Sequence, residues 1–172
     1  MLSEDQEINL LQNQMPFITI FSDGGFRNEL GYGGYGTIMT DGVHSMFLYG
    51  GYPNVTNNTM ELEAALSALR QLTTPCRVNI VSDSRYLCDG INSWVLKWAN
   101  NNWRNSMNKL ISNYQQWKEM FQFMQYHIIR ATWTKGHAGD AANQICDHLA
   151  TIGMFKTAGQ QVPPHLIDPK RK

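Results

Sequence analysis

The sequence lacks the features that would point to a membrane or to secretion. Its 172 residues contain no apolar run near the roughly 18 residues that a membrane-spanning helix needs. The N-terminal segment MLSEDQEINLLQNQMP is acidic and has no apolar core of the kind found in signal peptides. Cysteine is scarce, and an odd number of thiols without paired spacing is typical of a reducing compartment: Cys76, Cys88 and Cys146. We therefore expect a cytoplasmic protein.

What is present indicates one folded domain. The hydrophobic share is 42%, and five Trp, seven Tyr and seven Phe exclude an intrinsically disordered chain. A chain of 172 residues is long enough to bury one core without disulfides or structural metals.

Basic side chains are nearly absent from the first 69 residues. That segment has Arg27 against eight acids, for a net charge of −7, whereas residues 70–135 have nine bases against three acids, for +6. The formal net charge of zero hides this asymmetry. An acidic end facing a basic end would suit a nucleic-acid partner, but an ordinary solvated surface could have the same distribution. Charge alone leaves both interpretations open.

Hydrophobic patterning predicts an α/β fold. Strands are expected at 16–25, 31–42 and 43–53, with turns so short that they favour an antiparallel meander. A helix at 56–72, capped by Thr56, Asn57 or Asn58, precedes a strand at 77–84 and one or two short helices at 84–98. A polar loop at 100–113, a helix at 113–125, a strand at 127–133 and a helix at 141–154 follow. This order predicts a five-stranded mixed sheet, three antiparallel strands and then two parallel ones, flanked by helices, with a loose tail from Lys156.

Glu61 stands where a carboxylate is unexpected. On a helical wheel of residues 60–72 it projects between Ala68 and Leu72, beside the apolar arc. A buried carboxylate must be paired, protonated or bound to a cation. The alternative is a capping-box glutamate that reaches back to an asparagine cap, and the pattern leaves both open. The wheel has a polar arc as well, made of Glu63, Ser67, Arg70 and Gln71.

Two further acids share one pattern. Asp23 and Asp83 each follow an apolar strand and a serine, and each precedes a turn. If the two strands are parallel neighbours, both carboxylates emerge at the carboxyl edge of the sheet, where open α/β sheets place their sites. Taken singly, each could equally be a helix cap. Asp147 lies four residues after Asn143, so the two share one face of the last helix.

Four acids at one edge would repel one another without a cation. Oxygen ligands without a His or Cys cluster favour Mg²⁺ or Mn²⁺ over zinc. Two such ions suit in-line attack on a phosphodiester. His137 lies beside Lys135 in a glycine-flanked loop, where a surface histidine is usually inert but could shuttle protons beside a metal.

Four segments together resemble the motifs of type 1 ribonuclease H, and they occur in that family's order. They are Asp23-Gly24-Gly25 with GYGGYG, TNNTMELEAAL, VSDSRYLCDGI and KGHAGDAANQICDHLA. The successive separations of Asp23, Glu61, Asp83, His137 and Asp147 are 38, 22, 54 and 10 residues, which is the register of the bacterial enzymes. The resemblance covers residues 15–155 as a catalytic domain and leaves an N-terminal extension (1–14) and a C-terminal tail (156–172).

The resemblance implies a ribonuclease H-like fold and an endonuclease that hydrolyses the RNA strand of RNA/DNA hybrids. The products would carry 3′-hydroxyl and 5′-phosphate ends. It also implies that two Mg²⁺ ions, or Mn²⁺, are held by Asp23, Glu61, Asp83 and Asp147, while His137 assists turnover.

Substrate contacts are implied in the same way. The main chain at Gly24 and the TNN segment resemble minor-groove readers, Thr56 and Asn113 a phosphate pocket, and residues of about 93–113 the handle that cradles the DNA strand. Two of the four tryptophans near this handle are expected to be structural, with Trp94 and Trp103 against sugars. The full set of expected contacts is Gly24, Thr56, Asn57, Asn58, Arg85, Trp94, Lys97, Trp103, Arg104, Asn113, Lys135 and Asn143.

The chain departs from the bacterial pattern in its handle. Ala99-Asn100-Asn101-Asn102 stands where bacterial members have a dense run of lysine and arginine. Since each phosphate contact adds to affinity and to its salt dependence, we expect weaker hybrid binding and a shallower salt slope. Arg85 stands where glutamine or a similar polar residue is usual. The segment Phe26-Arg27-Asn28-Glu29-Leu30 replaces a small loop and puts an acid on the substrate side.

Several alternatives remain at this stage. The chain could be a free-standing enzyme, a ribonuclease H domain of a reverse transcriptase, or a non-catalytic hybrid-binding module on the same fold. An exonuclease or integrase-like relative would lack the TNNxME and KGHAGD motifs. The expected partner is an RNA/DNA hybrid. No membrane and no dedicated protein partner are expected, and a monomer is expected because the sequence shows no evident apolar patch.

Overall fold

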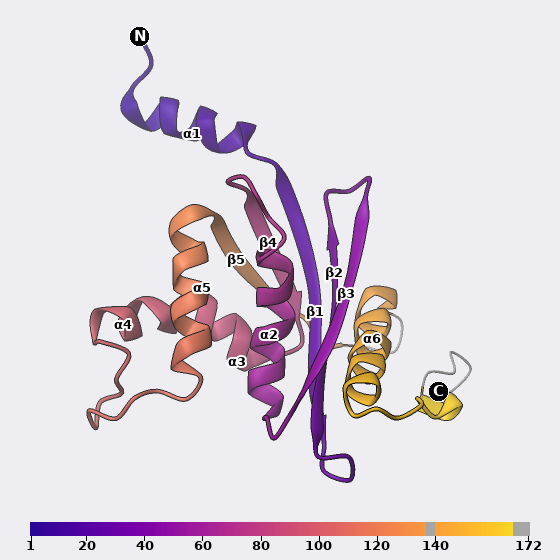
Figure 1. Cartoon of the computed structure of the whole chain (residues 1–172). Helices are drawn as coiled ribbons and strands as arrows, with labels where there is room; N and C mark the ends of the chain where they lie inside the picture. The colour runs from indigo at the N-terminus through magenta and orange to yellow at the C-terminus, as the bar shows by residue number, and fades with distance from the viewer. Residues whose placement is uncertain (137–139, 167–172) are drawn as a thin grey trace.

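The first three strands form the meander that their alternation predicts. In this computed structural model, which describes residues 1–136 and 140–166, β1 (Phe17–Arg27) pairs antiparallel with β2 (Tyr32–Thr40). β2 in turn pairs antiparallel with β3 (Ser45–Pro53). β4 (Arg77–Ser82) then joins β1 in parallel, and β5 (Ile128–Trp133) joins β4 in parallel. The described residues thus form the predicted five-stranded mixed sheet, in the order β3-β2-β1-β4-β5 (Figure 1).

Helices cover the sheet from both faces. α2 (Asn57–Leu69) packs on β1 and β2, with α3 (Arg85–Asp89) and α5 (Tyr114–Tyr126) beside it. α6 (Ala141–Thr157) packs on β1, β2 and β3 from the opposite face (Figure 1). A π-helical turn (Gly90–Trp94) joins α3 to α4 (Val95–Asn100), and a 3-10 turn (Pro164–Leu166) follows α6. In the described part of the chain, no helix is long and apolar enough to cross a membrane.

The core lies between α2 and the sheet. Ile20 of β1 and Ile80 of β4 are fully buried beneath Leu62 and Leu66 of α2. Trp117 of α5 closes the other side of α2, and its ring lies against Gly90, where any side chain would collide with it. α2 is therefore surrounded, and its residues from Met60 to Leu69 are all buried.

The predicted polar arc of this helix is wrong at two positions. Glu63 and Ser67 are buried because α2 packs against β2 as well as α5, and the Ser67 hydroxyl lies 3.4 Å from that of Thr37 in β2. Ser67 donates its hydroxyl proton to the Ala64 carbonyl at 2.7 Å. The Glu63 carboxylate accepts from the Arg70 guanidinium at 3.0 Å, and Arg70 also donates to Glu119 of α5 at 2.7 and 2.8 Å.

The two ends of the chain are more regular than expected. Residues of the N-terminal extension form α1 (Glu4–Gln14), which the sequence analysis does not predict. Its signal is a capping box: Ser3 accepts from the Gln6 amide, and the Gln6 side chain accepts from the Ser3 amide. At the other end α6 continues to Thr157, so Lys156 is helical rather than the start of a loose tail.

All three thiols are free and buried. Burial raises the pKa of Cys88 to about 11 and that of Cys146 to about 12. Cys76 has 3% of its surface exposed and donates to the Thr74 carbonyl. Buried thiols of this kind are unreactive, and free thiols agree with the reducing compartment that the sequence indicates.

Replacing Arg70 by methionine removes the cation that Glu63 and Glu119 share. Glu63 then keeps a carboxylate in a buried position without its partner. Because Arg70 is itself 37% exposed and partly screened, we expect a loss of about 2 kcal/mol in the free energy of unfolding, measured by urea denaturation. The double variant Glu63→Gln/Arg70→Met removes the stranded charge and should recover most of this loss. A double variant as unstable as the single one would contradict the assignment.

Candidate active site

Three carboxylates meet at the carboxyl edge of the parallel strands. Phe21 of β1 lies opposite Val81 of β4, and Asp23 and Asp83 each follow two residues further on. Glu61, in the second turn of α2, joins them from the face that this helix covers. One oxygen from each of the three side chains lies within 4.8 Å of the others. The structure therefore brings together three of the four predicted acids as one cluster.

A glycine makes this convergence possible. A Cβ atom at Gly24 would overlap the main chain of Met60 and Glu61, so only glycine lets α2 approach β1 this closely. The Gly24 amide donates to the Asp23 carboxylate at 2.9 Å. Gly24, expected only as a groove reader, thus also fixes the distance between Asp23 and Glu61.

Glu61 is not a capping residue. The N-cap of α2 is Thr56, whose hydroxyl accepts from the Thr59 amide at 3.1 Å. Thr59 therefore occupies the capping-box position, and Glu61 lies two residues beyond it. Of the two interpretations that the sequence left open, this geometry excludes the capping glutamate.

Burial and neighbouring acids raise the pKa values of the three carboxyl groups. Burial, followed by the charges of Asp23 and Asp83, raises the pKa of Glu61 to about 9. Burial and the charges of Asp83 and Asp147 raise the pKa of Asp23 to about 7. The pKa of Asp83 is raised as well, first by burial and then by Asp147. Without a counter-charge, these groups resist ionising together.

Asp147 lies at the rim of the cluster. It projects from α6 into a cavity of about 390 Å³ that Asp23 and Glu29 also line. α6 lies close to β2 because a Cβ at Gly36 would collide with the Cys146 carbonyl, one residue before Asp147. Asp147 is exposed and is near enough to raise the pKa values of Asp23 and Asp83.

The donor set fits a hard divalent cation. Within residues 1–136 and 140–166, the buried Glu61 Oε2 atom has no hydrogen-bond partner, and the cluster offers carboxylate oxygens as ligands. An unpaired carboxylate oxygen is costly to bury, and Mg²⁺ or Mn²⁺ would satisfy it while relieving the repulsion.

His137 lies outside the residues that the structure describes. Its neighbour Gly136 has a φ of +62° and lies beside Asp83 and the Asn143 amide, which would each contact a Cβ at this position. Asn143 of α6 is thus near the cluster. Lys135, the residue before Gly136, is exposed.

Arg85 is held in place by a residue that sequence reasoning missed. Its guanidinium carbon lies 3.6 Å above the centre of the Trp133 ring. The Trp133 indole N–H donates to the Asp83 carbonyl at 3.0 Å, which ties this stacked pair to the cluster. No sequence signal links Arg85 to Trp133, because the two lie on α3 and β5 and meet only through the sheet.

Thr59, which the sequence analysis did not single out, connects Thr56 with Asn113. The Thr56 and Thr59 hydroxyls are 2.9 Å apart, and Thr59 donates to Asn113 Oδ1 at 2.7 Å. Asn113 has a left-handed φ of 56° and donates its amide to the Tyr86 hydroxyl at 3.2 Å. The two members of the predicted phosphate pocket therefore share one hydrogen-bond network, while Asn57 and Asn58 are exposed in the first turn of α2.

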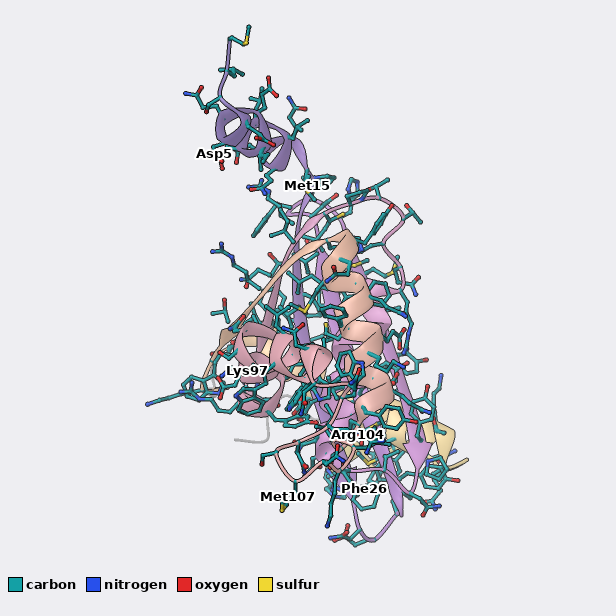
Figure 2. All side chains as sticks on the ribbon, turned by 90° about the vertical axis from the view of Figure 1, so that its left-hand side faces the viewer. Asp5, Met15, Phe26, Lys97, Arg104 and Met107 are labelled. Carbon is teal, nitrogen blue, oxygen red and sulfur yellow. The ribbon has the colours of Figure 1, made fainter. Side chains whose placement is uncertain are left out.

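The handle region projects from the body beside α5. Figure 2 shows Lys97 on α4 and Arg104 on the loop that follows, with Met107 at the outer part of that loop. Trp98, Trp103 and Trp117 pack on the core, and the Trp103 ring meets Phe121 edge-on at 5.8 Å. Trp94 is 36% exposed and is tilted against Trp98. Trp103, expected against a sugar, is thus largely used in packing.

A mixed sheet whose edge gathers buried carboxylates for a divalent cation defines a metal-dependent hydrolase. Comparisons with known proteins specify the family. The family model for RNase H matches residues 15–155. A ribonuclease H of Actinobacillus pleuropneumoniae is 41% identical over 139 residues, which is 81% of this chain and 91% of that protein. A ribonuclease H of Dichelobacter nodosus is 42% identical over 135 residues, or 78% of this chain and 90% of that one.

Solved structures agree with this assignment. LC9-RNase H1, a type 1 enzyme with the type 2 active-site motif, superposes with a TM-score of 0.70 at 30% identity, covering 86% of this chain and 74% of its own. The chain therefore belongs to the ribonuclease H family and is a metal-dependent hydrolase of that family.

Metal-free protein should lose stability as the pH rises. Asp23 and Glu61 have ordinary pKa values of 3.8 and 4.5 but keep their protons to about 7 and about 9 in the folded state. Between these limits the folded state binds more protons, so the free energy of unfolding falls with increasing pH. We expect the Tm in chelator to fall between about pH 4 and about pH 9, and millimolar Mg²⁺ to offset the fall.

Two Asp→Asn variants test this prediction: Asp23→Asn within the cluster, and a matched control outside it. Asp23→Asn should weaken both the pH dependence and the Mg²⁺ effect, whereas Asp5→Asn, in the exposed first turn of α1, should keep them. A wild-type Tm at pH 8 that is the same in chelator and in Mg²⁺ would argue against the cation site.

Proposed function

We propose that this chain is an endonuclease that hydrolyses the RNA strand of RNA/DNA hybrids and leaves 3′-hydroxyl and 5′-phosphate ends. One observation carries the proposal: a ribonuclease H chain places three carboxylate oxygens within 4.8 Å of one another, with a buried Glu61 oxygen that lacks a partner in the described part of the chain.

In this proposal Asp23, Glu61, Asp83 and Asp147 hold two divalent cations, Mg²⁺ or Mn²⁺. When bound, such a pair activates a water for in-line attack on the phosphodiester and stabilises the leaving oxygen. The chain contributes rigidity, because Glu61 lies on a helix that is buried on all sides and Asp23 is fixed beside Gly24. Asp147, on the exposed rim, closes the ligand set from α6.

Positive charge for the RNA strand comes from Arg85. Its guanidinium is already fixed on Trp133, so little side-chain entropy is lost when it binds a phosphate near Asp83. Lys135 and Asn143 would contact the same strand. His137 would assist proton transfer or product release, as the family resemblance implies.

Discrimination between the strands needs groups that sense 2′-hydroxyls. Asn57 and Asn58 are exposed at the start of α2 and offer both donors and acceptors to sugars and base edges in the minor groove, next to the Gly24 main chain. Thr56 and Asn113 would receive a phosphate of the DNA strand, and Trp94, Lys97 and Arg104 would lie along that strand.

We propose that the enzyme works in the cytoplasm, in keeping with its free thiols. One chain supplies every residue of the proposed site, so catalysis itself needs no second copy.

The test uses one labelled RNA in three forms: paired with DNA, paired with RNA, and single-stranded. We expect internal cuts in the hybrid alone, in Mg²⁺ and not in chelator. Asp23→Asn should lower the cleavage rate at least about a thousandfold while hybrid binding stays near that of the wild type, and Asp41→Asn should cleave normally. Tight hybrid binding without cleavage by the wild type would instead identify a binding module.

The lysine-poor handle should limit affinity. Ala99→Lys with Asn101→Arg adds two cations to α4 and the residue after it, where Lys97 is the present base. We expect tighter hybrid binding and a steeper dependence of log Kd on log salt, with a change in slope of up to about 2. The isosteric control Ala99→Met with Asn101→Gln adds length without charge. An unchanged Kd in the charged variant would remove the handle from the substrate path.

A further inference from the structure

Helix α1 lies mostly outside the body of the described structure. None of its residues is buried in the described structure, and the helix stands clear of the sheet beyond the start of β1 (Figures 1 and 2). Its side chains are acidic or apolar where they are not amides, with Glu4, Asp5 and Glu7 in the first turn and no base in the last. Because a helix of 11 residues is marginal alone in water, a partner surface would stabilise it.

One side of α1 carries a continuous stripe. Glu4, Ile8 and Leu11 follow the helical spacing, and Met15 extends the line just past the last turn. Ile8 and Leu11 are 46% and 64% exposed. Leu10, 51% exposed, points to the far side of the helix. The stripe therefore runs from an acidic end to an apolar end.

A cleft borders the C-terminal end of this helix. It has a volume of about 370 Å³, and its wall combines Gln12 and Asn13 of α1 with Phe17, Arg77 and Arg130 of the sheet. β1, β4 and β5 pair Phe17 with Arg77 and Asn79 with Arg130, so these side chains share the face of the sheet opposite α2. This face of β4 and β5 lies beyond α6, which packs on the first three strands.

The cleft carries unpaired positive charge. Arg77 lies 5.7 Å over the exposed Phe17 ring, and in the described residues its buried Nε atom has no hydrogen-bond partner. Arg130 is exposed. Asn79 uses its carbonyl oxygen to accept from Thr132 at 2.9 Å. Two guanidinium groups thus face a cleft whose lining, in the described structure, contains no carboxylate.

We propose that the stripe and the cleft are the two halves of one interface, through which a second copy of this chain binds. An antiparallel pairing about a two-fold axis places Ile8 against Leu11 of the second copy at the centre. The same pairing places Glu4 of the second copy beside Met15, two residues before Phe17 and hence next to Arg77. Each acidic helix end therefore meets the basic cleft of the other copy, and every contact occurs twice.

Charge favours a second copy over a nucleic acid as the occupant. α1 carries three acids and no base, so it would repel a phosphate backbone laid along it, whereas in the pair the acids of each first turn face Arg77 and Arg130 of the other copy. An 11-residue helix is about 16 Å long, so the interface is small for a specific one. We therefore expect a weak dimer with a micromolar Kd. The sequence predicts a monomer because it shows no evident apolar patch. In the folded chain, Ile8, Leu11 and Met15 form an apolar stripe on α1.

Sedimentation equilibrium of the full chain tests the proposal. We expect a monomer–dimer equilibrium between about 1 and 200 µM that weakens as NaCl rises from about 0.05 to about 0.5 M. Ile8→Ser/Leu11→Ser should raise the Kd at least about tenfold. Leu10→Ser, a change of the same kind on the other side of α1, should leave it unchanged. Equal effects of these two variants, or a monomer at every concentration, would overturn the proposal.

Charge reversal tests the reciprocal contact. Glu4→Arg and Arg77→Glu should each abolish the dimer, since both of its clefts then hold like charges. Mixing the two variants should restore it, because one cleft then holds the same ion pair with its charges exchanged and the other keeps the native pair. Circular dichroism checks the fold, and if Arg77→Glu fails to fold, the exposed Arg130→Glu takes its place. A mixture that stays monomeric would overturn the reciprocal arrangement.

Discussion

The parallel pairing of β1 with β4 is the constraint on which the rest of the site depends. It carries Asp23 and Asp83 to one edge, and the contact at Gly24 brings Glu61 against them. None of the three carboxylates can move away from the others without disturbing β1, the end of β4 or the buried helix α2. The electrostatic repulsion between them is therefore built into the fold: after burial, it contributes to the raised pKa values of Asp23 and Glu61.

The acids differ in how firmly the fold holds them. Glu61 belongs to a helix enclosed by the sheet, α3 and α5, whereas Asp147 belongs to the exposed side of α6 at the mouth of a cavity. In the proposed site, three ligands would thus be fixed before a cation arrives, and the fourth could adjust to it. Such a division would suit a site that binds its cations firmly yet releases a cleaved product.

Local sequence patterns predicted the parts of this structure that depend on short-range order. The strand–Ser–Asp repeat located Asp23 and Asp83, and the wheel separated Glu61 from the solvent side. The same wheel failed for Glu63 and Ser67, because periodicity assumes a single covered face and α2 is covered on both sides. The distant partners of Arg70 and Arg85 were equally inaccessible to local patterns. Glu119 and Trp133 are far away in the chain, and only the tertiary fold brings them near.

The N-terminal helix shows a different kind of omission. Its capping box is a local signal, and Ser3 with Gln6 could have been recognised. The role that we propose for the helix could not, because Arg77 and Phe17 become neighbours only when β1 and β4 pair. His137 remains a prediction from the family motif, since it lies outside the described residues.

The burial of every native thiol has a practical consequence. Cys76, Cys88 and Cys146 are enclosed, and the raised pKa values of Cys88 and Cys146 keep those two sulfurs protonated at neutral pH. Maleimide reagents, which attack thiolates, should therefore pass over them in the folded state. A single cysteine introduced on the surface would be the only reactive one, so the wild-type background can take a fluorophore or spin label at a chosen position without prior removal of cysteines.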